Sequence, residues 1–193
     1  MSPSVRGWTY ALSIALLGVS NAGGTSVPGL SFEELTDRSD LVVTGQVARS
    51  WTDWDSPHKY IWTHYELAVS ATLKGAAGAG VVVSEPGGVV GIQGMSVAGA
   101  VTYRPGERVL VFLQRMPNGY LRTTGWSQGK FDLDDTGHLH PQSAFGGVEF
   151  VDPPHGVSGS TPLREFNGVT VAEFYARIAA RLKAQGAVQG GVR

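Results

Sequence analysis

Apolar and polar residues alternate along several segments of this chain, and this period of two predicts β-strands. The longest such segment is 59–74, in which odd positions such as Ile61, Tyr65 and Leu67 form the apolar face expected to point into a core. The run 107–113 is the most apolar of the predicted strands, which is typical of a central strand covered on both faces. Further strands are predicted at 41–47, 81–84, 95–103, 120–124 and 130–134, with Leu139 beyond a turn at 135–137.

Two segments have the features of helix starts. Ser31 is followed three residues later by Glu34, and Thr170 is followed in the same way by Glu173, so each pair forms a capping box. The first helix is short, because the strand pattern resumes at residue 41. After the second capping box, apolar residues recur at helical spacing, which predicts an amphipathic helix. These residues are Val171, Phe174, Ile178 and Leu182.

The spacing of the strands predicts a mainly β protein, a small closed or nearly closed antiparallel barrel with a short N-terminal helix and a C-terminal amphipathic helix. We expect one barrel domain at 31–151. A flexible lead-in at 23–30 precedes it, and a Pro/Gly-rich linker at 152–168 follows it. The C-terminal helix at 169–186 is expected to pack on the barrel, and 187–193 to be a disordered tail.

Residues 1–22 are typical of a bacterial export signal. They contain Arg6, an apolar stretch from Trp8 to Val19, and small residues at Ser20 and Ala22, which fit the small-x-small cleavage rule. The stretch is much shorter than the roughly 20 residues that span a bilayer as a helix. The sequence therefore predicts a secreted protein, periplasmic or extracellular, that starts at Gly23 and has no membrane insertion after cleavage. The alternative is a buried N-terminal helix.

The composition narrows the function further. The chain has 193 residues and a formal net charge of −1, so it lacks the basic field that attracts nucleic acid, and no nucleic-acid partner is expected. It also has no cysteine. This excludes disulfides, a thiol nucleophile, a cysteine zinc site and a lipid-modified cysteine.

Three segments resemble a known family. Asp40-Leu-Val-Val-Thr-Gly-Gln-Val47, Leu73-Lys-Gly75 and Gly106-Glu-Arg-Val-Leu-Val-Phe-Leu113 resemble oligomer-binding-fold domains of the netrin and tissue-inhibitor-of-metalloproteinases type. With Pro86-Gly-Gly88 and Gly125-Trp-Ser-Gln-Gly-Lys-Phe131, the order is closer still to a group of uncharacterised exported bacterial domains, some of which precede matrixin-type metalloproteases.

The resemblance implies the barrel and supplies no activity. Tissue inhibitors of metalloproteinases chelate the zinc of their target through an N-terminal cysteine, which this chain lacks, so their inhibitory chemistry does not transfer. The chain also has no His-Glu-x-x-His motif, so no protease of that type is attached.

Metal binding has two weak candidates. His138 and His140 are two residues apart, so on a strand they point to the same side, but a zinc site needs further ligands that the sequence does not place nearby. The segment 132–137 resembles half of a calcium loop but has Ser143 where the closing Glu would stand. The favoured alternatives are a solvated hairpin arm and an acidic turn. We expect no metal and no cofactor.

The sequence gives little support for catalysis. Gly-x-Ser-x-Gly occurs once, at Gly125-Trp-Ser-Gln-Gly129, and this spacing alone does not make Ser127 a nucleophile. Spacing also does not single out Glu66 and Glu85 as an acid/base pair. A non-catalytic binding or protein-interaction domain is therefore the favoured function. A secreted hydrolase or metal-dependent enzyme with an unrecognised site, and a structural envelope component, remain open.

The strongest candidate for a binding site is a cluster of rings between the first two strands. Exposed rings among polar groups stack on sugars or anchor protein partners, so the expected ligand is a protein or carbohydrate of the cell envelope. The alternative is a second small core, in which Phe174, Ile178 and Leu182 of the C-terminal helix cover these rings. The predicted ligand-binding residues are Trp51, Trp54, Tyr60, Trp62 and His64.

Overall fold

The computed structural model describes residues 25–142, 148–151 and 163–190. The predicted export signal, the start at Gly23, Ser143 and most of the predicted linker lie outside these residues. Within them the protein is mainly β, with 45% of residues in strands and 21% in helices. A short N-terminal helix, α1 (Phe32–Arg38), and a long C-terminal helix, α2 (Val171–Gly190), confirm both predicted helices.

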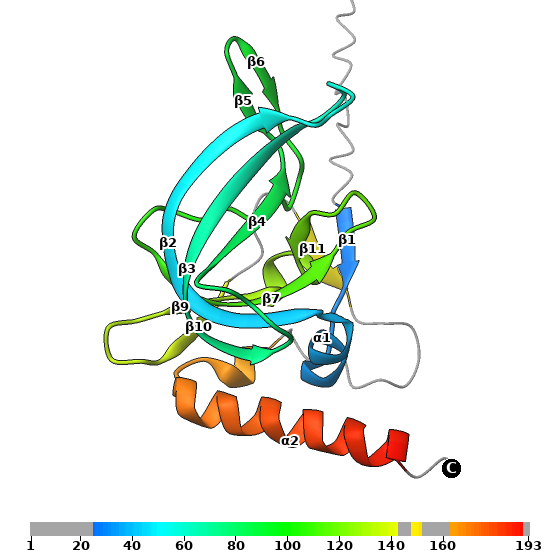
Figure 1. The fold of residues 1–193 in the computed structure, drawn as a ribbon, viewed down its shortest axis with the longest axis vertical. Helices are drawn as coiled ribbons and strands as arrows, with labels where there is room; N and C mark the ends of the chain where they lie inside the picture. The colour runs from blue at the N-terminus through cyan, green and yellow to red at the C-terminus, as the bar shows by residue number, and fades with distance from the viewer. Residues whose placement is uncertain (1–24, 143–147, 152–162, 191–193) are drawn as a thin grey trace, which may run out of the picture.

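Seven strands form the main sheet in the order β10-β9-β7-β2-β3-β4-β8 (Figure 1). The strands are β2 (Leu41–Trp54), β3 (Ile61–Lys74), β4 (Gly80–Pro86), β7 (Arg108–Arg115), β8 (Leu121–Thr123), β9 (Lys130–Leu133) and β10 (Leu139–Pro141). Two smaller sheets accompany it. β1 (Thr25–Pro28) pairs in parallel with β11 (Val148–Val151), and β5 (Gly88–Val90) pairs with β6 (Gln93–Met95) in a projecting hairpin.

The sheet is not a closed barrel, which corrects the closed form of the prediction. β8 pairs with β7 over three positions, but it meets β4 only where Val83 lies opposite Leu121. A strand of three residues is too short to join two strongly curved neighbours along their length, so this side of the sheet stays largely unsealed.

The two longest strands bend through irregularities in their pairing. The register of β2 against β3 shifts at three places, and one of them lies between Thr44 and Gly45. At Gly45 the backbones approach so closely that a Cβ atom would lie 2.4 Å from the carbonyl oxygen of Ala68. Bulges of this kind increase twist and bending. They give β2 and β3 the strong curvature seen in Figure 1.

The predicted core faces of β3 and β7 are confirmed. Ile61, Tyr65 and Leu67 of β3 are buried, and all residues from Val109 to Leu113 of β7 are fully buried. β7 is covered on both faces because alternate residues enter two different hydrophobic clusters. The alternating apolar pattern of β3 predicts a strand with one covered face, and the continuous apolar run of β7 predicts a strand covered on both faces. The structure shows this difference.

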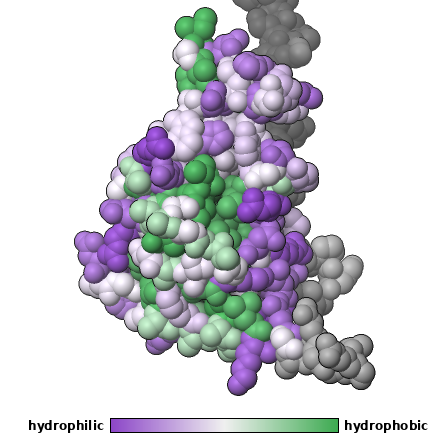
Figure 2. Space-filling view, in the orientation of Figure 1, coloured by the Kyte–Doolittle hydropathy of each residue, from purple (hydrophilic) through white to green (hydrophobic). Residues whose placement is uncertain are grey.

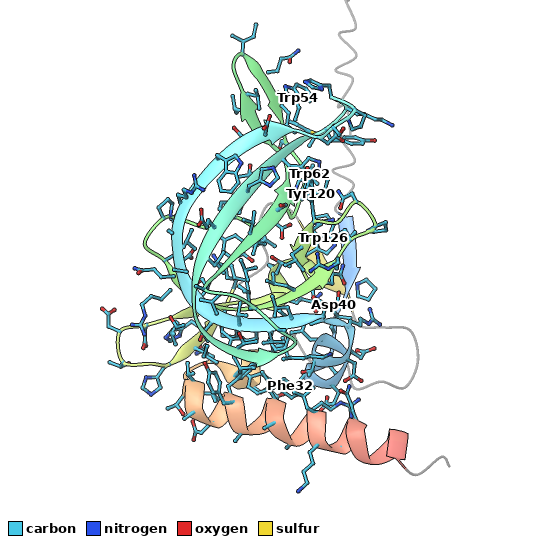
Figure 3. The ribbon with its side chains drawn as sticks, viewed as in Figure 1. Phe32, Asp40, Trp54, Trp62, Tyr120 and Trp126 are labelled. Carbon is cyan, nitrogen blue, oxygen red and sulfur yellow. The ribbon has the colours of Figure 1, made fainter. Side chains whose placement is uncertain are left out.

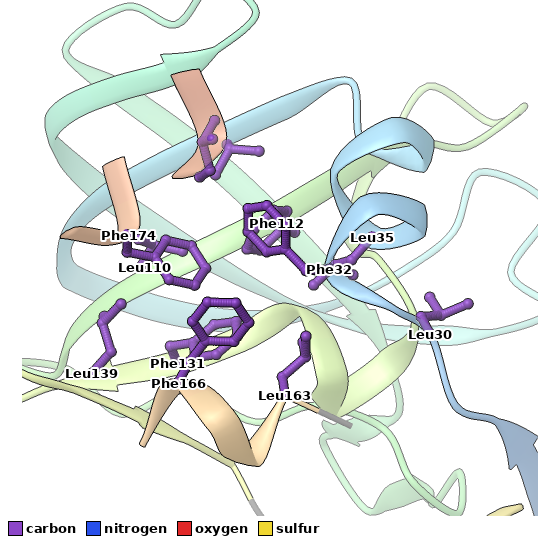
Figure 4. Close-up of a cluster of buried hydrophobic side chains, with 12 residues drawn as sticks. Leu30, Phe32, Leu35, Leu110, Phe112, Phe131, Leu139, Leu163, Phe166 and Phe174 are labelled. Atoms are coloured by element: carbon purple, nitrogen blue, oxygen red, sulfur yellow. The ribbon is translucent and has the colours of Figure 1, made fainter. Parts of the chain in front are cut away.

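The first cluster lies between the sheet and the helices (Figure 4). Phe174 of α2 contacts the rings of Phe32, Phe112 and Phe131, with ring centroids between 5.3 and 5.9 Å apart. The short 3-10 helix η2 (Arg164–Phe166) adds Phe166. α2 therefore covers this end of the sheet, and the alternative in which it covers the Trp51–Trp62 rings is wrong.

The second cluster fills the curve formed by β2, β3, β4 and β7. Val101 and Tyr103 complete it from a segment that has no strand, which corrects the strand predicted at 95–103. A turn in which Ala100 N–H bonds the carbonyl of Val97 breaks the extended backbone, as does Gly99 with φ of 75°. The apolar spacing there reflects burial of single side chains at one end of the sheet.

Several element ends differ from the prediction. β2 continues to Trp54, beyond the predicted end at 47, so Trp51 and Trp54 lie on a strand, and η2 lies within the predicted linker. β1 occupies half of the segment predicted as a flexible lead-in, because its backbone pairs with β11, which is distant in sequence. α2 continues to Gly190, beyond the predicted start of the tail. Both capping boxes are present, with Ser31 and Glu34 bonding each other's backbone N–H, and Thr170 and Glu173 doing the same.

The helices among the described residues are too short or too polar to cross a membrane.

Candidate functional site

The outer face of β2, β3 and β4 holds the site with the most distinctive chemistry. Trp51 lies opposite His64, which in turn lies opposite Ser84, so these three side chains point to the same side of the sheet. Asp53 and Trp62 face each other one step further along the strands. This side is opposite the second hydrophobic cluster, so its residues are not needed to fill that core.

Six residues form a continuous series of contacts, which we call the aromatic row (Figure 3 labels Trp62, Tyr120 and Trp126). The row consists of Trp51, His64, Tyr120, Trp62, Arg122 and Trp126. Successive ring centroids, or the Arg122 guanidinium carbon and the ring beside it, are 5.1 to 5.9 Å apart. The members come from β2, β3, β8 and the turns on both sides of β8.

His64 links the two halves of the row. Its ring stacks on Trp51 and meets the edge of Tyr120, and its Nδ1 is 2.8 Å from the hydroxyl of Ser84. Burial lowers the pKa of His64, while the nearby charge of Asp53 acts in the opposite direction. His64 thus places a polar ring between the rings of Trp51 and Tyr120.

Arg122 has an unusual environment for a charged side chain. It is only 16% exposed, and its guanidinium lies between the rings of Trp62 and Trp126. Its Nη2 is 3.4 Å from the buried carboxylate of Glu85, whose other oxygen accepts a bond of 2.8 Å from Thr123 N–H. Burial raises the pKa of Glu85, and the positive charge of Arg122 opposes that rise.

A pocket of about 240 Å³ lies at the Trp126 end of the row. Trp126 opens the 3-10 helix η1 (Trp126–Gly129) and has a φ of 60°, which is rare for a bulky residue. The polar and aromatic residues that line the pocket are Arg38, Gln114, Arg122, Thr123, Thr124, Trp126 and Gln128.

The structure brings together three of the five predicted ligand-binding residues, Trp51, Trp62 and His64. The other two lie at the far end of the β2–β3 hairpin (Figure 3 labels Trp54). There Trp54 stacks on His58, and Tyr60 is 45% exposed beside Lys59. They are outside the aromatic row because the hairpin extends beyond β4 at that end.

Sequence reasoning missed Tyr120, Arg122 and Trp126. They are about 60 residues away from Trp62 along the chain, and only the pairing of β8 with β4 and β7 brings them beside it. The sequence offered only local features that could have marked these residues as part of a site. Tyr120 directly follows the turn at 117–119, and Trp126 lies in a Gly-rich segment.

The histidines proposed as weak metal ligands lie elsewhere, at the β9–β10 turn. The carboxylate of Asp134 accepts bonds from the backbone and hydroxyl of Thr136 and from the backbone of His138, and it lies 3.0 Å from Nε2 of His140. These bonds hold the pKa of Asp134 far below its usual range and raise the pKa of His140. The carboxylate thus closes a turn, as the acidic-turn alternative for 132–137 requires.

Among the described residues, no group of three potential metal-ligating side chains has the arrangement of a metal site. The expected absence of bound zinc remains a prediction, which elemental analysis of protein purified without a histidine tag would test.

The two carboxylates considered for catalysis do not face a common cleft. Glu66 lies on the outer face, where it pairs with Arg49, whereas Glu85 is buried beside Arg122. A second pocket, of about 220 Å³, is lined by Tyr65 and Glu85 and by part of the segment after β6. Glu66 is not among its lining residues.

No protein-family model matches this sequence, and no curated protein is significantly similar to it.

Proposed function

We propose that this protein is a secreted, non-catalytic carbohydrate-binding domain whose ligand lies along the aromatic row. The observation that carries the proposal is the assembly of Trp51, Tyr120 and Trp62 on a face that α2 does not cover. The rings at the other end of the sheet are covered by α2 and fill the first cluster, whereas the rings of the row belong to neither hydrophobic cluster.

The chemistry of this face suits sugars. Aromatic rings offer flat apolar surfaces for the C–H faces of a sugar ring, and polar groups beside them fix its orientation. Trp51 is 37% exposed, and the ion pair of Arg49 and Glu66 lies next to it on the same face. The row thus combines a stacking surface with hydrogen-bonding groups at its border.

The strand connections support a more specific fold for this mainly β protein, namely an oligomer-binding fold with a partly open sheet. β2, β3 and β4 follow one another as antiparallel neighbours, β7 returns to pair with β2, and β8 lies beside β4 in parallel. In that fold type the second and third strands and the adjoining loops bind oligonucleotides and oligosaccharides. The second and third strands correspond here to β3 and β4, which border the row. The low net charge favours sugars over nucleic acid.

Secretion is part of the proposal, and it rests on residues 1–22. Mass spectrometry of exported protein should find a chain that begins at Gly23. Material that begins at Met1 would contradict it.

Binding to immobilised polysaccharides tests the proposed function. Affinity electrophoresis through gels that each contain one plant or bacterial polysaccharide should retard the wild type in at least one gel. Trp51→Ala should lose that retardation, because the exposed end of the row is removed. Trp54→Ala is the matched control, since it removes an indole outside the row and should be retarded like the wild type. Equal retardation of all three proteins, or of none, would overturn the proposal.

One observation favours a second candidate, a protein partner bound at the β5–β6 hairpin. Ile92 at its tip is fully exposed, and Val89 is exposed beside it, so the hairpin carries an apolar tip (Figure 2). Crosslinking in the envelope fraction with wild type and Ile92→Asp would test this candidate. A specific crosslinked protein that the variant loses would support it, and identical crosslinking patterns would count against it.

A further inference from the structure

Arg122 has more hydrogen-bond donors than the described residues satisfy. A guanidinium has five N–H groups, and within the described part of the chain this one donates a single bond, from Nη2 to Glu85 at 3.4 Å. Its Nε is buried and has no acceptor among the described residues, and the same is true of Nε1 of the neighbouring Trp62. Buried donors in folded proteins are almost always paired, so these two donors leave hydrogen-bonding capacity beside the row that a ligand or an ordered water can satisfy.

The surrounding rings hold Arg122 in place before any ligand arrives. Trp62 and Trp126 flank the guanidinium, at 5.9 and 5.1 Å from its central carbon. Trp126 keeps a left-handed backbone, and a strained conformation of this kind persists only where the surrounding structure fixes it. An arginine that is fixed by stacking loses little freedom on binding, and its planar fork matches a carboxylate or phosphate.

The pocket beside Arg122 supplies a second cation. Arg38, at the end of α1, lines the same pocket, and no Asp or Glu is among the lining residues. Arg38 is paired with Glu34 at 3.4 Å, but both side chains are well exposed, so this pair is weak and easily exchanged for a ligand. Gln114, Thr124 and Gln128 add neutral polar groups to the wall.

The charge balance favours an anion with a single negative charge. Glu85 already offsets the charge of Arg122, and Arg38 contributes one positive charge to the pocket once a ligand displaces its weak pair with Glu34. A carboxylate matches one charge, whereas a phosphate monoester carries nearly two at neutral pH.

We propose that the glycan bound along the aromatic row is acidic, and that the carboxylate of a uronic acid residue occupies the pocket between Arg38 and Arg122. This inference rests on the proposed function, and it identifies the class of sugar and the part of the site that selects it. The row contacts the apolar faces of the sugars, and the pocket at the Trp126 end of the row binds the carboxylate.

Calorimetric titration of the full chain with two probes tests the inference. The probes are a galacturonic acid oligomer and the galactose oligomer of the same length, which differ in the carboxylate. Wild type should bind the acidic probe at least tenfold more tightly, and this preference should weaken as salt is added. Arg38→Gln should reduce the affinity for the acidic probe about tenfold and leave the neutral probe unchanged.

A matched control is Arg108→Gln, which removes an exposed arginine at the opposite end of β7. It should bind both probes like the wild type.

Because Arg122 is mostly buried, its replacement also affects stability, so Arg38 is the decisive position. Arg122→Lys should keep a positive charge but lose acid selectivity, and a melting curve like that of the wild type would show that it is folded.

The outcomes separate this inference from the proposed function. If neither probe nor any polysaccharide binds, the proposed function fails, and this inference fails with it. If both probes bind equally and Trp51→Ala abolishes binding, the row binds sugar but the acidic pocket is refuted. If glucose 6-phosphate binds in an Arg38-dependent way and the galacturonic acid oligomer does not, the pocket is a phosphate site and the carboxylate assignment is wrong.

Discussion

Lys130 and Glu107 form an ion pair inside the protein, with Nζ of the lysine 2.8 Å from Oε1 of the glutamate. The lysine side chain is 1% exposed. Its Nζ also donates to the carbonyl of Thr102 and lies 4.6 Å from the centre of the Tyr103 ring. The pair therefore ties β9 to the irregular segment after β6, which has few backbone bonds of its own to hold it in place.

Removing one member of this pair should destabilise the protein strongly. Glu107→Gln leaves the buried ammonium with only the more distant and more exposed carboxylate of Asp132, 3.5 Å away, so we expect a loss of about 3 kcal/mol in the free energy of unfolding, at the low end for a broken buried pair. Lys130→Met should cost less, because Glu107 is partly exposed and water can solvate it. Urea denaturation of both variants measures the difference. A smaller loss for Glu107→Gln than for Lys130→Met would contradict this account of the pair.

The centre of the first cluster should depend on Phe112. This side chain is fully buried and contacts Phe131 and Phe174, so Phe112→Ala should lose about 3–5 kcal/mol through lost burial and a cavity. Val82→Ala, on an exposed position of β4, is the control and should change stability by less than about 0.5 kcal/mol. A melting temperature of Phe112→Ala within a degree or two of the wild type would argue against a central β7.

The two kinds of tryptophan in the β2–β3 region should respond differently to truncation. Trp54 contacts the ring of His58 near the end of the hairpin, so Trp54→Ala should cost less than about 1 kcal/mol. Trp62 packs against both Tyr120 and Arg122, so Trp62→Ala should cost about 3 kcal/mol. The midpoints of urea denaturation test this order, and a reversed order would place Trp54 in a core.

Two histidines should titrate on opposite sides of their ordinary pKa of 6.5. The carboxylate of Asp134 raises the pKa of His140, whereas burial lowers that of His64. The contribution of His140 to stability is thus present below pH 6.5 and is lost as the pH rises through its folded pKa. The contribution of His64 is present above pH 6.5 and is lost as the pH falls through its own folded pKa.

Chemical shifts of the imidazole protons, followed by NMR from pH 4 to 9, measure both values. Asp134→Asn is the control, and it should return the pKa of His140 toward 6.5 without affecting His64. If His140 of the wild type titrated below 6.5, the bond between His140 and Asp134 would not exist in solution.

Several features followed from the sequence because short-range physics decides them. The continuous apolar run at 109–113 and the alternation from Ile61 to Leu67 reflect how many faces of a strand are covered, and both were confirmed. The capping boxes at Ser31 and Thr170 satisfy free backbone N–H groups within one turn of helix, so residues three apart suffice to predict them.

The spacing of buried apolar residues does not always distinguish a β-strand from an irregular segment. Val101 and Tyr103 are spaced like residues on one face of a strand, but their segment has no strand, because a turn and Gly99 redirect the chain. β1 was missed because its partner, β11, lies more than 100 residues further along the chain. Pairing over such distances leaves no mark on either segment alone.

The chain's amino-acid sequence by itself determined the mainly β class, the central strand, both helix starts and the aromatic content of the β2–β3 region. Tertiary structure alone decided which rings meet. The contact of Trp62 with Tyr120 and Arg122 requires β8 to reach the edge of β4, where one ladder pair, Val83 and Leu121, and the bonds of Glu85 to β8 hold the two strands together. Whether the sheet closes depends on the same short strand, because closure is a property of how distant strands fit together rather than of any one strand's pattern.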